Sequence, residues 1–148
     1  MDVQEALAGQ MVEAAKTKNR EKLSTLRMIK AALHNREIDL KGSMIDDDAL
    51  QVLSSMAKQR RDSIEQFTEG NRSDLAEKEE RELAIIQGFM PAQLSPEDIR
   101  AEIEKAIAEA EAMTMRDMGK VMKILMPRLT GKADGKAVSE LVKEALSS

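Results

Sequence analysis

The sequence predicts an all-α protein of two helical subdomains, an N-terminal one of about four helices and a small C-terminal three-helix bundle. Apolar residues recur every three or four positions along almost the whole chain, which is the period of an amphipathic helix. No stretch alternates apolar and polar residues as a half-buried strand does. Two of the three prolines lie in the segment Pro91–Pro96. We place the boundary there, between subdomains 1–93 and 94–148.

The N-terminal subdomain is expected to contain four helices. Asn19 is a suitable N-cap for the second helix, and three aspartates give the start of the third helix the negative charge that its dipole favours. Gly70 and Asn71 end the third helix, and Pro91 stops the fourth. The four helices are expected at about residues 3–17, 20–38, 46–69 and 72–89.

The C-terminal subdomain is expected to contain three shorter helices. Ser95 precedes a proline and stands three residues before Asp98, which is a strong helix start. Thr114 and Asp117 form a second capping box, and the helix that it opens stops at Pro127 or soon after. The first and third helices of this subdomain are expected at about residues 96–112 and 135–147.

The composition limits the chemistry that the chain can perform. Cysteine is absent, which excludes disulfides, thiolate catalysis and cysteine metal sites and indicates a reducing compartment. With two Phe, no Trp and no Tyr, the core has to be aliphatic, with methionine as an adaptable filler. We see neither a secretory signal nor an apolar run of roughly 18 residues that could span a membrane. We therefore expect a soluble, cytoplasmic protein that makes no membrane contact.

Charge is distributed unevenly along the chain. The net charge of −4 argues against a general nucleic-acid binder. However, residues 16–36 carry seven basic residues against one acidic residue, and residues 116–136 carry six against two. The long middle, residues 37–115, carries nine basic and nineteen acidic residues. Local basic patches of this kind can bind phosphate although the net charge is negative.

Residues 116–136 form the strongest candidate binding surface. On a helical wheel, a face that contains Met118, Met122 and Leu125 lies opposite a basic band, and a loop with two glycine–lysine steps follows the helix. We expect a buried face that contains methionine, a basic outward face, and glycines that let a partner approach the backbone. Without aromatic residues, base stacking is not available, so an RNA would be bound through its backbone and shape. The candidate RNA-binding residues are Arg116, Gly119, Lys120, Lys123, Gly131, Lys132 and Lys136.

Catalytic, metal and nucleotide sites are not expected. Gly131-Lys132 lacks the first glycine, the hydroxyl and the preceding strand of a phosphate-binding loop. His34 is the only histidine, and it has no recognisable partners for catalysis or metal binding. We therefore name no catalytic residue, no metal and no cofactor.

Two further features have a structural and a functional interpretation. Arg60 and Arg61 interrupt an apolar face and could bind phosphate, but an ion pair with Glu79 or Glu82 is favoured. A methionine stripe could form an adaptable hydrophobic groove, but packing in the core is favoured. The stripe consists of Met115, Met118, Met122 and Met126.

Several motifs together resemble the GatB/YqeY domain family, and the match to its free-standing YqeY-like members covers essentially the whole chain. The motifs are Leu26-Arg27-Met28-Ile29-Lys30-Ala31-Ala32, Lys58-Gln59-Arg60-Arg61-Asp62-Ser63-Ile64, Met90-Pro91-Ala92-Gln93-Leu94-Ser95, Met118-Gly119-Lys120-Val121-Met122-Lys123 and Gly131-Lys132-Ala133-Asp134-Gly135-Lys136.

The resemblance implies a larger N-terminal helical subdomain and a small C-terminal bundle. It also implies a tRNA-binding or RNA-binding helper module, because the related tail of the GatB subunit of the glutamine-dependent tRNA amidotransferase contacts the outer corner of tRNA. The positions that match this tail are Gly119, Met122, Lys123, Gly131, Lys132 and Ala133. This chain departs from the tail by about one extra helical turn between Met122-Lys123 and Gly131-Lys132.

Two alternatives to RNA binding alone stay open. The first is a component of a carbon–nitrogen ligase with glutamine as amido-N-donor, which would act only with amidotransferase or other protein partners, because the residues offer no machinery for that reaction. The second is a protein-interaction domain that binds no RNA, in which the acidic middle and the methionine face contact another protein.

Overall fold

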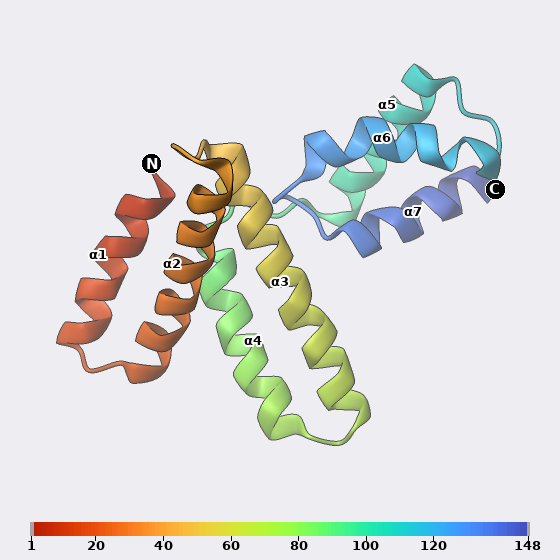
Figure 1. The fold of residues 1–148 in the computed structure, drawn as a ribbon. Helices are drawn as coiled ribbons and strands as arrows, with labels where there is room; N and C mark the ends of the chain where they lie inside the picture. Colours follow the sequence, from red (N-terminus) through yellow and green to blue (C-terminus); the bar gives the residue numbers. More distant parts are fainter. Residues whose placement is uncertain (1, 148) are drawn as a thin grey trace. The chain divides into compact units, whose positions relative to one another are not determined.

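The fold is helical, as the sequence predicts, and the computed structural model describes residues 2–147 (Figure 1). None of these residues forms a strand. The chain divides into two compact units, Met1–Pro91 and Ala92–Ser148. The first contains α1 (Val3–Lys16), α2 (Arg20–Leu40), α3 (Asp46–Glu69) and α4 (Ser73–Gln87). The second contains α5 (Pro96–Ala110), the short 3₁₀ helix η1 (Met115–Asp117), α6 (Met118–Leu129) and α7 (Gly135–Ser147).

The first unit consists of two helical hairpins, α1 with α2 and α3 with α4 (Figure 1). Within each hairpin a short turn joins the two helices. Its core is aliphatic, as expected, and its largest fully buried side chains are Leu26, Ile29, Leu33, Leu53 and Ile86. Leu26, Ile29 and Leu33 recur at helical spacing along α2, which buries one face of this helix and leaves its charged face in solvent.

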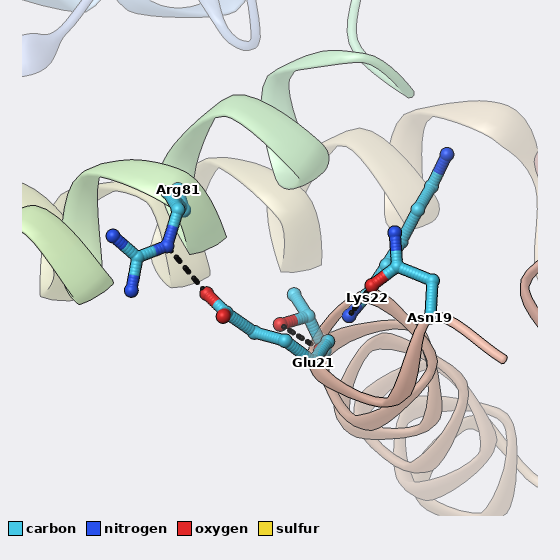
Figure 2. Close-up of polar contacts among 5 residues, drawn as sticks. Asn19, Glu21, Lys22 and Arg81 are labelled. Atoms are coloured by element: carbon cyan, nitrogen blue, oxygen red, sulfur yellow. Dashed lines mark hydrogen bonds and ion pairs between the residues drawn. The ribbon is translucent and has the colours of Figure 1, made fainter.

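Local signals set the helix ends of this unit. The Asn19 side chain accepts a hydrogen bond from the backbone N–H of Lys22 at 3.1 Å, so the predicted N-cap is confirmed (Figure 2). After α3 the left-handed residue is Asn71, with φ 58°, while Gly70 keeps a negative φ. Asparagine tolerates this conformation better than most residues, so it serves here as the residue that reverses the chain.

Arg60 pairs with the acidic residues of α4. Its Nε lies 3.3 Å from Oε2 of Glu82 and 3.7 Å from Oε2 of Glu79. Arg60 and Glu82 are both buried. The favoured interpretation of Arg60 as an ion-pair partner is therefore confirmed, and this contact fixes α4 against the middle of α3.

The second unit has a separate aliphatic core in which α5, α6 and α7 meet. Val121, Leu125 and Leu129 form the buried face of α6. They pack with residues of the two flanking helices, among them Ile99, Ile103, Val138 and Val142. The predicted Ser95 cap is confirmed by a 3.2 Å hydrogen bond from Asp98 N to Ser95 Oγ. The Thr114–Asp117 capping box is also present, although it opens η1, which leads directly into α6.

The prediction that the methionine stripe packs in the core is wrong for two of its members. Met115 and Met126 are 43% and 36% exposed, and Met118 and Met122 are only partly buried. For Met126 the cause is the helical period, because Val121, Leu125 and Leu129 occupy the centre of the buried face of α6 and Met126 falls beside it. Met115 lies before this helix, on η1. Pro127 lies inside the last turn of α6, which ends two residues later, as predicted.

Candidate nucleic-acid interface

All seven candidate RNA-binding residues lie in the second unit, on η1, on α6, in the loop that follows it and at the start of α7. Arg116 belongs to η1, and three candidates lie on α6. The remaining three lie in the loop after α6 or in the first turn of α7. Because α6 has twelve residues and a helix rises 1.5 Å per residue, α6 is about 18 Å long, and its three candidates lie in its first two turns.

The packing of α6 sets the direction of its lysines. Val121 and Leu125 are fully buried against α5 and α7. Lys120 and Lys123 lie on the opposite side of the helix, where they are exposed. The core therefore fixes the backbone positions from which these two flexible side chains extend into solvent. Arg116, Lys132 and Lys136 are exposed as well.

Few acidic groups neutralise this surface. None of residues 2–147 forms an ion pair with Arg116, Lys123 or Lys132. The ammonium of Lys120 lies 3.8 Å from Oδ1 of Asp117, and both side chains are reached by solvent, so the contact is weak. Arg128 differs, because its guanidinium donates to Glu109 on α5 at 2.7 Å.

Asp117 organises the start of α6. Its Oδ2 accepts hydrogen bonds from the backbone N–H groups of Met113 at 2.9 Å and Thr114 at 3.3 Å. These two bonds, followed by the charge of Lys120, hold the pKa of the Asp117 carboxyl below its ordinary value. The carboxylate thus fixes the turn that precedes the basic helix, although it also brings a negative charge close to that helix.

The two candidate glycines have different environments. Gly119 is exposed, and a Cβ at this position would meet no atom within 4 Å. Glycine in a helix costs up to about 1 kcal/mol relative to alanine. Nothing in the packing of the second unit requires a glycine at this position. The bare backbone of Gly119 is therefore available for close approach by a partner.

The expectation that Gly131 also exposes its backbone to a partner is contradicted. Gly131 is buried, and its φ of 79° is a conformation that favours glycine. Its carbonyl accepts a hydrogen bond from Nε2 of Gln93 at 2.8 Å, and the next carbonyl, of Lys132, accepts one from Leu94 N at 2.9 Å. Gly131 therefore shapes and anchors the loop, and the exposed Lys132 side chain remains at its surface.

Sequence reasoning missed the part played by Gln93. Residues 93 and 94 hold the carbonyls of residues 131 and 132 across a wide sequence separation. No local sequence pattern predicts this contact, because a glutamine in a segment flanked by prolines usually faces solvent.

A histidine-based site and a metal site find no support within the described part of the chain. His34 is exposed, and its Nδ1 lies 4.0 Å from Glu37. No three potential metal-ligating side chains converge in residues 2–147. Over the same residues, none of the helices combines the length and the apolar composition that a membrane crossing needs.

Comparison with known proteins identifies the family. A family model described as Yqey-like protein matches residues 4–146. The chain belongs to the YqeY family. The resemblance to free-standing YqeY-like proteins is thus confirmed over nearly the full length of the sequence.

Several fungal YqeY relatives carry the name Altered inheritance of mitochondria protein 41, mitochondrial. The relative from Lachancea thermotolerans is 42% identical over 86 residues, which is 57% of this chain and 45% of the relative. The relative from Eremothecium gossypii is 33% identical, over 68% of this chain and 56% of the relative. The relative from Pyrenophora tritici-repentis is 28% identical over 144 residues, or 96% of this chain and 80% of the relative. The match spans about half the length of the first of these relatives.

The prediction of a cytoplasmic location is wrong by these comparisons, because the matched relatives are named as mitochondrial proteins. The prediction depended in part on the absence of cysteine, which indicates a reducing environment. That signal does not separate one reducing compartment from another.

Proposed function

We propose that this YqeY-family protein binds folded RNA, and tRNA in particular, through the exposed basic side of α6 and the residues that flank it. The observation that carries the proposal is the placement of Lys120 and Lys123 opposite the buried Val121 and Leu125. The resemblance to the tail of the GatB subunit supports tRNA as the class of RNA.

The expected contacts are electrostatic and depend on shape. Arg116, Lys120 and Lys123 would contact successive phosphates along one side of the RNA, and Lys132 would extend the contact beyond the end of α6. The bare Gly119 would let the sugar–phosphate backbone approach the helix closely. In this proposal Gly131 acts indirectly, because its backbone is already hydrogen-bonded to Gln93.

The opposite charge of the neighbouring helix helps to orient the RNA. Residues 96–111, which comprise α5 and the residue after it, carry six acidic residues against two basic ones. Residues 116–136 carry six basic residues against two acidic ones. This asymmetry within one unit would favour approach of a polyanion to the α6 side and disfavour approach to α5.

The test is a tRNA titration at several salt concentrations, followed by fluorescence anisotropy. The variant is Lys120→Glu/Lys123→Glu, and its matched control is Lys105→Glu/Lys143→Glu, which changes the net charge equally in the same unit outside residues 116–136. We expect the affinity of the α6 variant to fall by at least tenfold. We expect its salt slope to decrease by about 2, roughly 0.9 for each lost phosphate contact.

Two results would contradict the proposal. One is equal tRNA binding by the wild type and the α6 variant, and the other is an equal loss in the control variant, which would show a non-specific effect of net charge. Because relatives are named as mitochondrial proteins, the titration includes mitochondrial as well as cytosolic tRNA.

A further inference from the structure

A polar cleft of about 850 Å³ lies within the first unit, between α2, α3 and α4. Gln59, Arg60 and Ser63 of α3 line it together with residues of the two neighbouring helices. At its edge, Nε of Arg81 donates to Oε1 of Glu21 at 2.6 Å, which links α4 to α2 (Figure 2). The cleft is lined only by residues of the first unit, whereas the candidate RNA surface consists of residues of the second.

The Arg60 side chain is nine-tenths buried and reaches this cleft with unused hydrogen-bond donors. Its Nε is enclosed and makes no hydrogen bond within residues 2–147, although it lies 3.3 Å from Glu82 as an ion pair. The terminal Nη groups also donate no hydrogen bond to these residues, and they are not among the enclosed atoms. Buried donors without acceptors are rare in folded proteins because desolvating them is costly. Nε stays enclosed beside Glu82, whereas the open Nη groups can donate to a ligand in the cleft.

The cleft presents both signs of charge. Lys78 and Arg20 line it as cations that form no ion pair within the described residues, and Glu79 and Glu82 line it as acids. Burial, followed by the negative charge of Glu82, raises the pKa of the Glu79 carboxyl, and the charge of Arg60 offsets part of this effect. A ligand with a positive group beside Glu79 and Glu82 would relieve that repulsion.

We propose that this cleft binds a small zwitterion that carries a carboxylate and an ammonium group, the class to which free α-amino acids belong. The Arg60 guanidinium is a planar fork of donors that matches a carboxylate, and Lys78 adds a second cation. Glu79 and Glu82 accept hydrogen bonds from the ammonium. One small ligand can contact both the guanidinium of Arg60 and the carboxylate of Glu82, because Nε of Arg60 lies only 3.3 Å from Oε2 of Glu82. A phosphate fits this cleft less well, because it would meet two carboxylates with no positive group of its own to offer them.

The ligand side chain would extend along the α2 wall. Met28, which is 41% exposed, lines the cleft there, beside Ser24. Methionine adapts to side chains of different shapes. We therefore expect the cleft to accept ligand side chains of different shapes but to be selective for the charged groups of the ligand.

The experiment is a titration of the full chain with each standard α-amino acid at millimolar concentration, followed by amide chemical shifts in NMR. We expect at least one amino acid to shift amides of residues 59–63 and 78–82 in a saturable manner. Its carboxylate-only and amine-only analogues should bind at least about tenfold more weakly, because each of them meets only half of the charged groups.

Variants separate binding from structural support. Arg60→Lys keeps the charge but removes the fork, and we expect about tenfold weaker binding. Because Arg60 also supports the α3–α4 contact, Lys78→Ala provides a second test at an exposed position, with an expected severalfold loss and unchanged thermal unfolding. Lys58→Ala is the control, because Lys58 lies on the same helix, pairs with Asp62 and does not line the cleft.

The absence of saturable shifts for every amino acid would overturn the proposal. Equal binding of the carboxylate-only analogue would overturn it as well, since the cleft would then be a simple anion site. Unchanged affinity in both Arg60→Lys and Lys78→Ala would place the ligand elsewhere. These outcomes do not depend on tRNA binding, which uses residues of the second unit.

Discussion

Two exposed helix glycines, Gly9 in α1 and Gly119 in α6, form a matched pair at the scale of single residues. At both positions an added Cβ would meet no atom within 4 Å. Replacing either glycine by alanine should therefore raise the free energy of unfolding, by up to about 1 kcal/mol. The gain should be smaller for Gly119, because it is the second residue of its helix. Urea unfolding followed by circular dichroism measures both.

The same pair tests the use of bare backbone in RNA binding. Gly119→Leu should weaken tRNA binding by about tenfold, because the side chain would keep the RNA backbone away from α6. Gly9→Leu, in the other unit, should leave tRNA binding unchanged. Full affinity in Gly119→Leu would mean that RNA does not contact this part of α6.

The pKa of Glu79 predicts a dependence of stability on pH. In the folded state this pKa is raised above its ordinary value of 4.5. Ionisation of the carboxyl therefore opposes folding, and the protein loses stability as pH rises from 4.5 through the folded-state pKa. Glu79→Gln cannot ionise and should have a higher free energy of unfolding than the wild type at neutral pH. This advantage should disappear as pH falls below about 4.5. Thermal unfolding at a series of pH values checks it, and a difference that is constant with pH would contradict it.

At the scale of the element, α6 combines a buried aliphatic face with an exposed basic one. Leu125 is fully buried and Met126, its neighbour, is 36% exposed. Leu125→Ala should therefore lower the free energy of unfolding of the second unit by about 2–5 kcal/mol, because it leaves a cavity in the core. Met126→Ala should lower it by less than about 1 kcal/mol. Chemical denaturation of the two variants compares them directly, and equal losses would mean that Met126 belongs to the core.

At the scale of the whole molecule, each unit has its own aliphatic core, and the chain divides after Pro91. A fragment of residues 92–148 should therefore fold alone. A fragment of residues 94–148, which begins at the boundary drawn from the sequence, lacks the Gln93 side chain that donates to Gly131. It should be less stable by about 1 kcal/mol, the net contribution of one hydrogen bond. Urea unfolding of both fragments measures the difference, and an unfolded 92–148 fragment would contradict the prediction.

The sequence determined the features that depend on neighbours within one or two helical turns. The caps at Asn19, Ser95 and Thr114 were predictable because each side chain hydrogen-bonds to backbone two or three residues ahead. The helical class and the outward direction of Lys120 and Lys123 follow from the period of the apolar residues.

Only the tertiary structure decided the features that depend on residues far apart in the chain. It placed Gln93 against Gly131, enclosed the predicted Arg60–Glu82 pair while leaving donors of Arg60 unused, and left Met115 exposed. The physical reason is that burial and long-range hydrogen bonding depend on which helix faces meet. The periodicity of the apolar residues defines an apolar face for each helix. It does not predict which other helix packs on that face or which residues of the face become buried.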